Sequence, residues 1–233
     1  MNACFFLQPW FDKLYETFIA KGYYKLLLQG FGNTIIITLG ALCIGVIIGT
    51  LIAVVKYFAE DTKWLRPFAV ISDIYVTVIR GIPVVVLLLI FYFIILASAQ
   101  GTFVAIITFG INSGAYVAEI IRSGIMSVDQ GQFEAGRSLG LTYVQTMWYI
   151  IIPQAFKNVL PALGNEFITL LKETSICGYI ALTDVTHGAN TVRSQTYEPY
   201  MPLFAAALIY LVSVSVLSAL ISRLERRMRV NER

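Results

Sequence analysis

The stretch FGNTIIITLGALCIGVIIGTLIAVV, residues 31–55, carries no charged side chain, and its length decides in which solvent the chain folds. Roughly 20 apolar residues in an α-helix cross the hydrocarbon core of a bilayer. Helices are expected rather than strands, because lipid cannot satisfy exposed backbone groups and the apolar runs lack the alternation of a membrane barrel. Residues 31–55 therefore predict a membrane-spanning helix.

The rest of the chain has the same character. Of 233 residues, 58% are hydrophobic and 13% charged, about half the charged fraction of soluble proteins. Further apolar segments predict spans at residues 67–97, 102–122, 148–171 and 199–222. We predict an all-α polytopic membrane protein with about five transmembrane helices. Residues 1–29 would form an N-terminal interfacial segment without a removable signal peptide, and residues 30–233 one transmembrane domain.

The distribution of charge predicts the orientation of the chain in the lipid bilayer. If the N-terminus is outside and the C-terminus cytoplasmic, basic residues concentrate on the inner face, as the positive-inside bias requires. These are Lys56, Lys63, Arg66, Arg122, Arg137, Arg223, Arg226, Arg227, Arg229 and Arg233. Trp10, Phe11, Leu14 and Phe18 share one helical face, which predicts a helix lying on the outer leaflet; a frayed terminus is the alternative.

A polar stretch at residues 123–146 is too long for an ordinary connection between spans. Asp129 can start a short helix over residues 130–139, and Gly140 suits the left-handed residue that ends it. Thr142 and Gln145 have the spacing of a capping box that starts the next helix. We expect a short helix crosswise at the inner surface, able to transmit force from a cytoplasmic partner. A merely solvated loop is the alternative.

Polar residues inside the expected spans predict a path through the membrane, because such groups are costly in lipid. They are Asn112, Tyr116 and Glu119 in the third span, and Asn165, Glu166 and Thr169 in the fourth. Pro161 predicts a broken helix beside Asn165 and Glu166. The alternative is that the charged residues hold the bundle together. Small residues form a ridge for close packing, either within the subunit or between two copies, at positions Ala41, Gly45, Gly49 and Ala53.

Several motifs carry a resemblance to a known family. Glu134-Ala135-Gly136, then Gly140, then Ile150 to Pro153 resemble the EAA loop of ATP-binding-cassette (ABC) importer permeases of type I. Gly136 departs from the family's second alanine, and Ile152 from its leucine. The wider likeness is to permeases of histidine, glutamine and arginine importers. It covers Asn33-Thr34 and residues 78–83, 113–122 and 160–167. We call residues 123–153 the EAA-like loop.

The resemblance implies a permease subunit in the plasma (inner) membrane of a prokaryote. It implies a second permease, identical or similar, two ABC ATPase subunits and an extracellular or periplasmic substrate-binding protein. The chain has no G-x-x-x-x-G-K-[ST] phosphate loop, so ATP and Mg²⁺ are expected on the partner and this chain is not itself an enzyme. No cofactor, catalytic residue, metal site or nucleic-acid partner is expected in it.

The substrate is expected to be a polar or cationic amino acid. Glu166 lacks an obvious cation at helical spacing, which favours arginine, lysine or histidine. Glutamine or another neutral polar amino acid is the alternative. A channel is a more distant possibility, and it would leave the EAA-like pattern unexplained.

Overall fold

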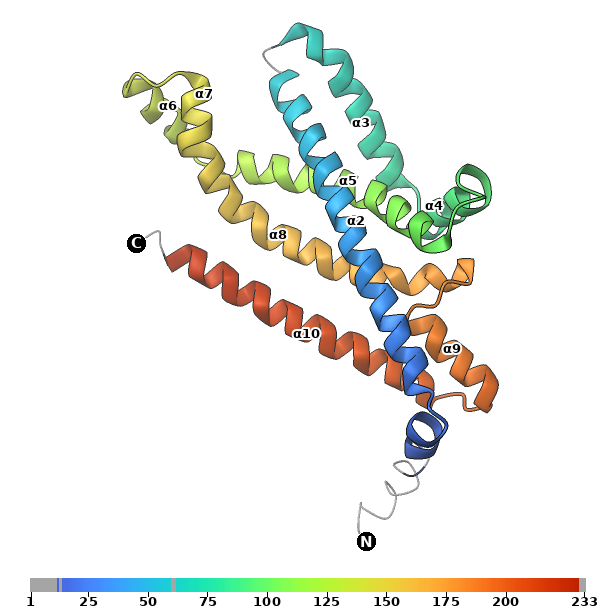
Figure 1. Ribbon diagram of the computed structural model, residues 1–233. Coiled ribbons are helices and arrows are strands. Elements are labelled where there is room, and N and C mark those ends of the chain that lie inside the picture. Colours follow the sequence, from blue (N-terminus) through green and yellow to red (C-terminus); the bar gives the residue numbers. More distant parts are fainter. Residues whose placement is uncertain (1–11, 13, 60–61, 231–233) are drawn as a thin grey trace.

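The computed structural model describes residue 12, residues 14–59 and residues 62–230 of the chain, and within these ranges the regular structure is helical throughout (Figure 1). The α-helices are α2 (Tyr24–Ala59), α3 (Arg66–Gly81), α4 (Val84–Ile90), α5 (Gly101–Met126), α6 (Gly131–Ser138), α7 (Tyr143–Thr146), α8 (Ile152–Glu173), α9 (Val185–Thr196) and α10 (Met201–Val230). Short 3₁₀ or π turns join them: η1 (Tyr15–Ala20), η2 (Lys63–Leu65), η3 (Phe91–Ile95), η4 (Met147–Ile151) and η5 (Thr174–Ile180).

The centre of the fold is the crossing of α2 and α5, where glycines of each helix receive side chains of the other. A Cβ atom added to Gly49 would lie 2.6 Å from Cβ of Val117. In the opposite direction, a Cβ atom on Gly114 would lie 2.8 Å from Cγ2 of Ile48. The small-residue ridge of α2 therefore packs within the subunit, against a matching ridge that includes Gly110 on α5.

The other helices pack around this pair. α8 lies against α5, and α10 lies beside α8, with Gly164 of α8 in contact with Ile221 of α10 (Figure 1). Buried apolar side chains from α2, α4, α5, α8 and η5 form the main core. Figure 1 places α6 and α7 at one end of the bundle and α9 near the opposite end.

Length and composition agree with a polytopic membrane protein. Among the described residues, α2, α5 and residues 201–228 of α10 are long and apolar enough to cross a bilayer, and the α3–α4 pair is a fourth candidate if it counts as one span. α8 occupies most of the predicted fourth span, but it does not qualify by composition. The prediction of about five spans is not contradicted.

The span predicted over residues 67–97 is not a straight helix, because the chain bends by 104° between residues 63–81 and residues 84–95, as in a broken span or a re-entrant loop. Ile82 is extended (φ −102°, ψ 130°), as expected for a residue before proline, and Pro83 has no N–H to continue the helix. The break predicted at Pro161 is wrong, since α8 runs through that proline without interruption. The broken helix is α3–α4.

The segment between α8 and α10 contains a helix, α9, that was not predicted from the sequence. Asp184 is buried at its start and accepts hydrogen bonds from the N–H groups of Thr186 (2.7 Å) and His187 (3.1 Å). The hydroxyl of Tyr210 in α10 also donates to Asp184, at 3.2 Å. Burial raises the pKa of the Asp184 carboxyl, and these hydrogen bonds act in the opposite direction. The carboxylate thus joins α9 to α10.

At the N-terminal end, α2 begins at Tyr24, earlier than the predicted boundary at residue 30. Trp10 and Phe11, part of the predicted interfacial helix, lie outside the described residues. Phe18 is buried in a cluster with Leu27 of α2 and Val185 of α9, so η1 packs on the bundle through this side chain.

The α2–α5 crossing generates a stability prediction. Gly49→Ala should destabilise the protein by about 1–3 kcal/mol, because the added methyl group forces the two helices apart. Gly32→Ala, in the same helix, is the matched control, since a Cβ atom at Gly32 would meet nothing within 4 Å. Thermal unfolding of the detergent-purified protein should show a lower melting temperature for Gly49→Ala alone. Equal melting temperatures for the two variants would contradict the close packing.

Candidate functional site

The short helix of the EAA-like loop is α6, Gly131–Ser138, which lies within the predicted residues 130–139. The Asp129 carboxylate accepts a hydrogen bond from the N–H of Gly131 at 2.6 Å. Gly140 has φ +76°, and its N–H donates to the carbonyl of Arg137 at 2.9 Å. Leu141 donates to the carbonyl of Gly136 at 3.0 Å, which completes a Schellman motif. The prediction that Gly140 ends the helix in the left-handed conformation is confirmed.

The next helix, α7, starts at the predicted capping box. The N–H of Gln145 donates to the hydroxyl of Thr142 at 3.3 Å, and the N–H of Thr142 donates to the side-chain oxygen of Gln145 at 2.9 Å. Pro153 follows in the first turn of α8, where a proline nitrogen loses no helical hydrogen bond. The path from α6 into α8 is therefore short and well defined.

Gly136, the departure from the family's alanine, is buried between α6 and α7. A Cβ atom at Gly136 would lie 2.5 Å from the Oγ1 atom of Thr146, so glycine is needed for this contact. Glu134 and Ala135 are exposed in the same turn. The buried glycine holds α6 on α7, and the other two residues of the motif face outward.

An aromatic stack fastens the EAA-like loop to the bundle. The ring of Tyr143 in α7 stacks between Phe133 of α6 and Tyr57 of α2, with centroid distances of 6.0 and 6.2 Å. The hydroxyls of Tyr57 and Tyr143 are also hydrogen-bonded to each other. Ile150 packs against a buried cluster that includes Met147 and Ile151. The sequence analysis missed this stack, because the spacing of its members along the chain carries no signal of their contact.

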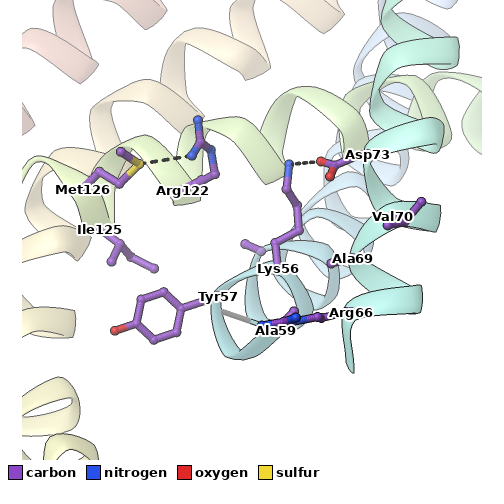
Figure 2. A pocket seen from close by; sticks show the side chains of 11 residues that line it. Lys56, Tyr57, Ala59, Arg66, Ala69, Val70, Asp73, Arg122, Ile125 and Met126 are labelled. Atoms are coloured by element: carbon purple, nitrogen blue, oxygen red, sulfur yellow. Dashed lines mark hydrogen bonds and ion pairs between the residues drawn. The ribbon is translucent and has the colours of Figure 1, made fainter. Parts of the chain in front are cut away.

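Glu119, which was predicted to line the substrate path, takes part in a group of ion pairs between α2, α3 and α5. The ammonium of Lys56 lies 2.7 Å from Asp73 and 3.4 Å from Glu119. The guanidinium of Arg122 lies 3.8 Å from the other oxygen of Glu119. Figure 2 shows Lys56, Asp73 and Arg122 lining a pocket of about 550 Å³. This agrees with the alternative that these charges hold the helices together.

Asn112 and Tyr116 are the other two residues of α5 that were predicted to line the path. Asn112 is buried, and the ring of Tyr116 lies under the guanidinium of Arg80, 5.1 Å from ring centroid to Cζ. Arg80 is in the last turn of α3, immediately before the break.

The polar residues of α8 divide between two faces. Asn165 and Thr169 are exposed on the surface of the subunit. Glu166 is turned inward, 9% exposed, and accepts a hydrogen bond of 2.7 Å from the hydroxyl of Ser113 on α5. Across the described part of the chain, no ion pair joins Lys172 to Glu173. Within one subunit, Glu166 of the predicted path is therefore joined to α5, whereas Asn165 and Thr169 lie on the surface.

In the residues that the structure describes, no group of three or more His, Cys, Asp or Glu side chains is arranged to hold a metal ion. Helices long and apolar enough to cross a membrane, with the short helix α6 between two parts of the bundle, indicate a polytopic membrane protein. Residues 45–230 match the family described as "Binding-protein-dependent transport system inner membrane component", and the chain belongs to this family.

Two relatives are similar to this chain over most of their length. The arginine transport system permease protein ArtQ of Bacillus subtilis is 38% identical over 210 residues, which cover 88% of this chain and 94% of that protein. The putative glutamine transport system permease protein GlnP of Rickettsia felis is 37% identical over 220 residues, 92% of this chain and 99% of that protein.

A solved structure shares the fold. The crystal structure of an amino acid ABC transporter with histidines contains a chain of TM-score 0.83 and 42% identity, covering 89% of this chain and 96% of that one. The predicted family and the all-α fold of a polytopic importer permease are thus confirmed, and the chain is an inner membrane component.

Proposed function

We propose that this chain is the permease subunit of an ABC importer that carries a polar or cationic amino acid into the cytoplasm. The observation that carries the proposal is the EAA-like loop, whose helix α6 ends at Gly140 and stacks through Phe133 on Tyr143 of α7, while Glu134 and Ala135 remain exposed. Tyr143 in turn stacks on Tyr57 of α2. A rigid, exposed helix between two spans can bind a partner subunit and transmit its movement to the spans. The arginine, glutamine and histidine systems named for similar proteins support the substrate class.

The partner that we propose for α6 is an ATPase subunit, one for each of two permeases, with ATP and Mg²⁺ bound there. Since the present chain has no phosphate-binding loop motif, the energy has to enter from outside it. A binding protein would deliver the amino acid on the other side of the membrane, as the family description implies.

The exposed face of α8 supports a second permease copy, identical or similar. Asn158, Asn165, Thr169 and Lys172 are all exposed along this helix. Such groups are expensive in hydrocarbon, so a protein surface or a water-filled path has to cover them. Two permeases with these faces turned toward each other would enclose a polar route, with Asn165 and Thr169 along it. Asn112, Tyr116 and Glu119 would border it from α5.

The proposed orientation can be tested by labelling. With the N-terminus outside, single cysteines placed near His187 and in residues 98–101 should react with a membrane-impermeant maleimide in intact cells. Cysteines at Gln132 and Arg229 should react only after the membrane is opened. Labelling of Gln132 in intact cells would reverse the orientation.

The proposed role of the EAA-like loop predicts uncoupling. Gly140→Val should cost on the order of 1 kcal/mol in backbone strain and displace α6 from its partner. In proteoliposomes that contain the whole transporter, the amount of amino acid taken up per ATP hydrolysed should fall at least tenfold. Glu134→Lys should lower this ratio in the same way.

Gly22→Val is the matched control for Gly140→Val. Gly22 also has positive φ (+72°) and open space around its Cβ position, but it lies far from the loop. This variant carries the same kind of strain and should keep uptake coupled to ATP hydrolysis. Undiminished uptake by both loop variants would exclude the loop as the transmission element.

Glu166 supports the preference for a cationic amino acid. Its carboxylate is buried between α5 and α8, where a negative charge is costly, and among the described residues the hydrogen bond that it accepts comes from Ser113, a neutral group. A substrate cation would supply the missing positive charge. Glutamine or another neutral amino acid remains the second candidate, because the named relatives include glutamine permeases.

Glu166→Gln separates these two substrate classes. Glutamine keeps an oxygen that can accept the Ser113 hydrogen bond, so the variant removes the charge and little else. Uptake of arginine by the whole transporter should fall about tenfold or more, and uptake of glutamine should change far less. ATPase activity that is stimulated by a neutral amino acid alone, and that is unaffected by Glu166→Gln, would exclude the cationic substrate.

A further inference from the structure

Arg80 is a charged residue that the fold leaves without a charged partner. It lies in the last turn of α3, its side chain is exposed, and its guanidinium is 5.1 Å from the ring centroid of Tyr116. No carboxylate of the described residues lies within 4.0 Å of it. A cation over an aromatic face is stabilised only modestly compared with a paired charge.

The position of Tyr116 places this guanidinium deep in the membrane. Tyr116 is ten residues from the end of α5 at Met126 and fifteen from its start at Gly101, which corresponds to about 15 and 22 Å along the helix. The hydrocarbon core is about 30 Å thick. An exposed guanidinium at this depth cannot face lipid, so it has to face water or an anion.

The nearby acidic residues are already engaged. Asp73 lies 2.7 Å from Lys56, and Glu119 is shared between Lys56 and Arg122. Asp73 and Glu119 are thus paired with Lys56 and Arg122, and the guanidinium of Arg80 has no carboxylate partner among the described residues. An anion that completes this site has to come from outside the subunit.

The break of α3–α4 provides room beside Arg80. A Cβ atom at Gly81 would meet nothing within 4 Å, and the following residue, Ile82, is extended rather than helical. No other helix of the described subunit therefore covers the backbone at Gly81, the residue next to Arg80.

We propose that Arg80 binds the α-carboxylate of the transported amino acid. This inference rests on the proposed function and adds to it the group that recognises the part common to all amino acids. The planar guanidinium can donate two parallel hydrogen bonds to a carboxylate, and Tyr116 holds that plane in place. Glu166 would then act on the side chain or ammonium of the substrate, and Arg80 on its acid end.

The test measures equilibrium binding of tritiated arginine to the purified permease–ATPase complex in lipid nanodiscs, without the binding protein. Leaving out the binding protein matters, because that protein makes its own contacts with the carboxylate. Arginine and arginine methyl ester compete with the label, and the ratio of their inhibition constants reports recognition of the acid group. In the native complex, the inhibition constant of the methyl ester should be at least tenfold higher than that of arginine.

Arg80→Gln should weaken arginine binding at least tenfold. It should also bring the ratio of the two inhibition constants, ester to arginine, close to one. Arg80→Lys, which keeps the charge but not the fork, should give an intermediate ratio. Arg66→Gln is the matched control: it removes an exposed arginine from the other end of α3 and should leave both constants unchanged. Size-exclusion profiles and basal ATPase activity check that each variant is assembled.

An unchanged ratio in an assembled Arg80→Gln complex would overturn the inference and leave the proposed function intact. That result would assign the guanidinium to a carboxylate of the second permease. If the native complex binds none of a panel of labelled amino acids, the proposed function fails and the inference falls with it. If the Arg80→Gln complex does not assemble, Arg80→Lys is the deciding variant. An intermediate ratio of the inhibition constants supports the inference, and an unchanged ratio overturns it.

Discussion

The close approach of α2 and α5 is the constraint on which the rest of the structure depends. Helices in lipid gain little from burying apolar side chains, because the solvent is equally apolar, so they associate through close packing. Gly45 and Gly49 on one helix, and Gly110 and Gly114 on the other, allow side chains to reach the opposing backbone. α3 rests on the same crossing, where the hydroxyl of Tyr75 donates to the carbonyl of Ile111.

Local signals in the sequence predicted local structure well. The apolar runs located most of the spans, and Gly140, Thr142 and Gln145 located the ends of α6 and α7, because caps depend on residues a few positions apart. The family resemblance then identified the EAA-like loop. The ridge on α2 was recognised, whereas its counterpart on α5 was not, since nothing in a single sequence pairs two helices.

Predictions that depended on tertiary contacts were less successful. Pro161 was the predicted break, whereas the helix breaks before Pro83, which follows the extended residue Ile82. Glu119 and Glu166 were both expected to line the path, yet their neighbours are Lys56 and Ser113, which come from distant parts of the sequence. α9 was missed because its buried face is short and its cap, Asp184, reads as a loop residue.

The length of α2 has a mechanical consequence. Its 36 residues extend over about 54 Å, well beyond the roughly 30 Å of hydrocarbon, and no proline interrupts them. One end holds Gly30 against the backbone of Asp184 at the start of α9, and the other end carries Lys56 and Tyr57 beside the EAA-like loop. A tilt imposed on either end of this continuous rod displaces the other, so a single helix joins events on the two faces of the membrane.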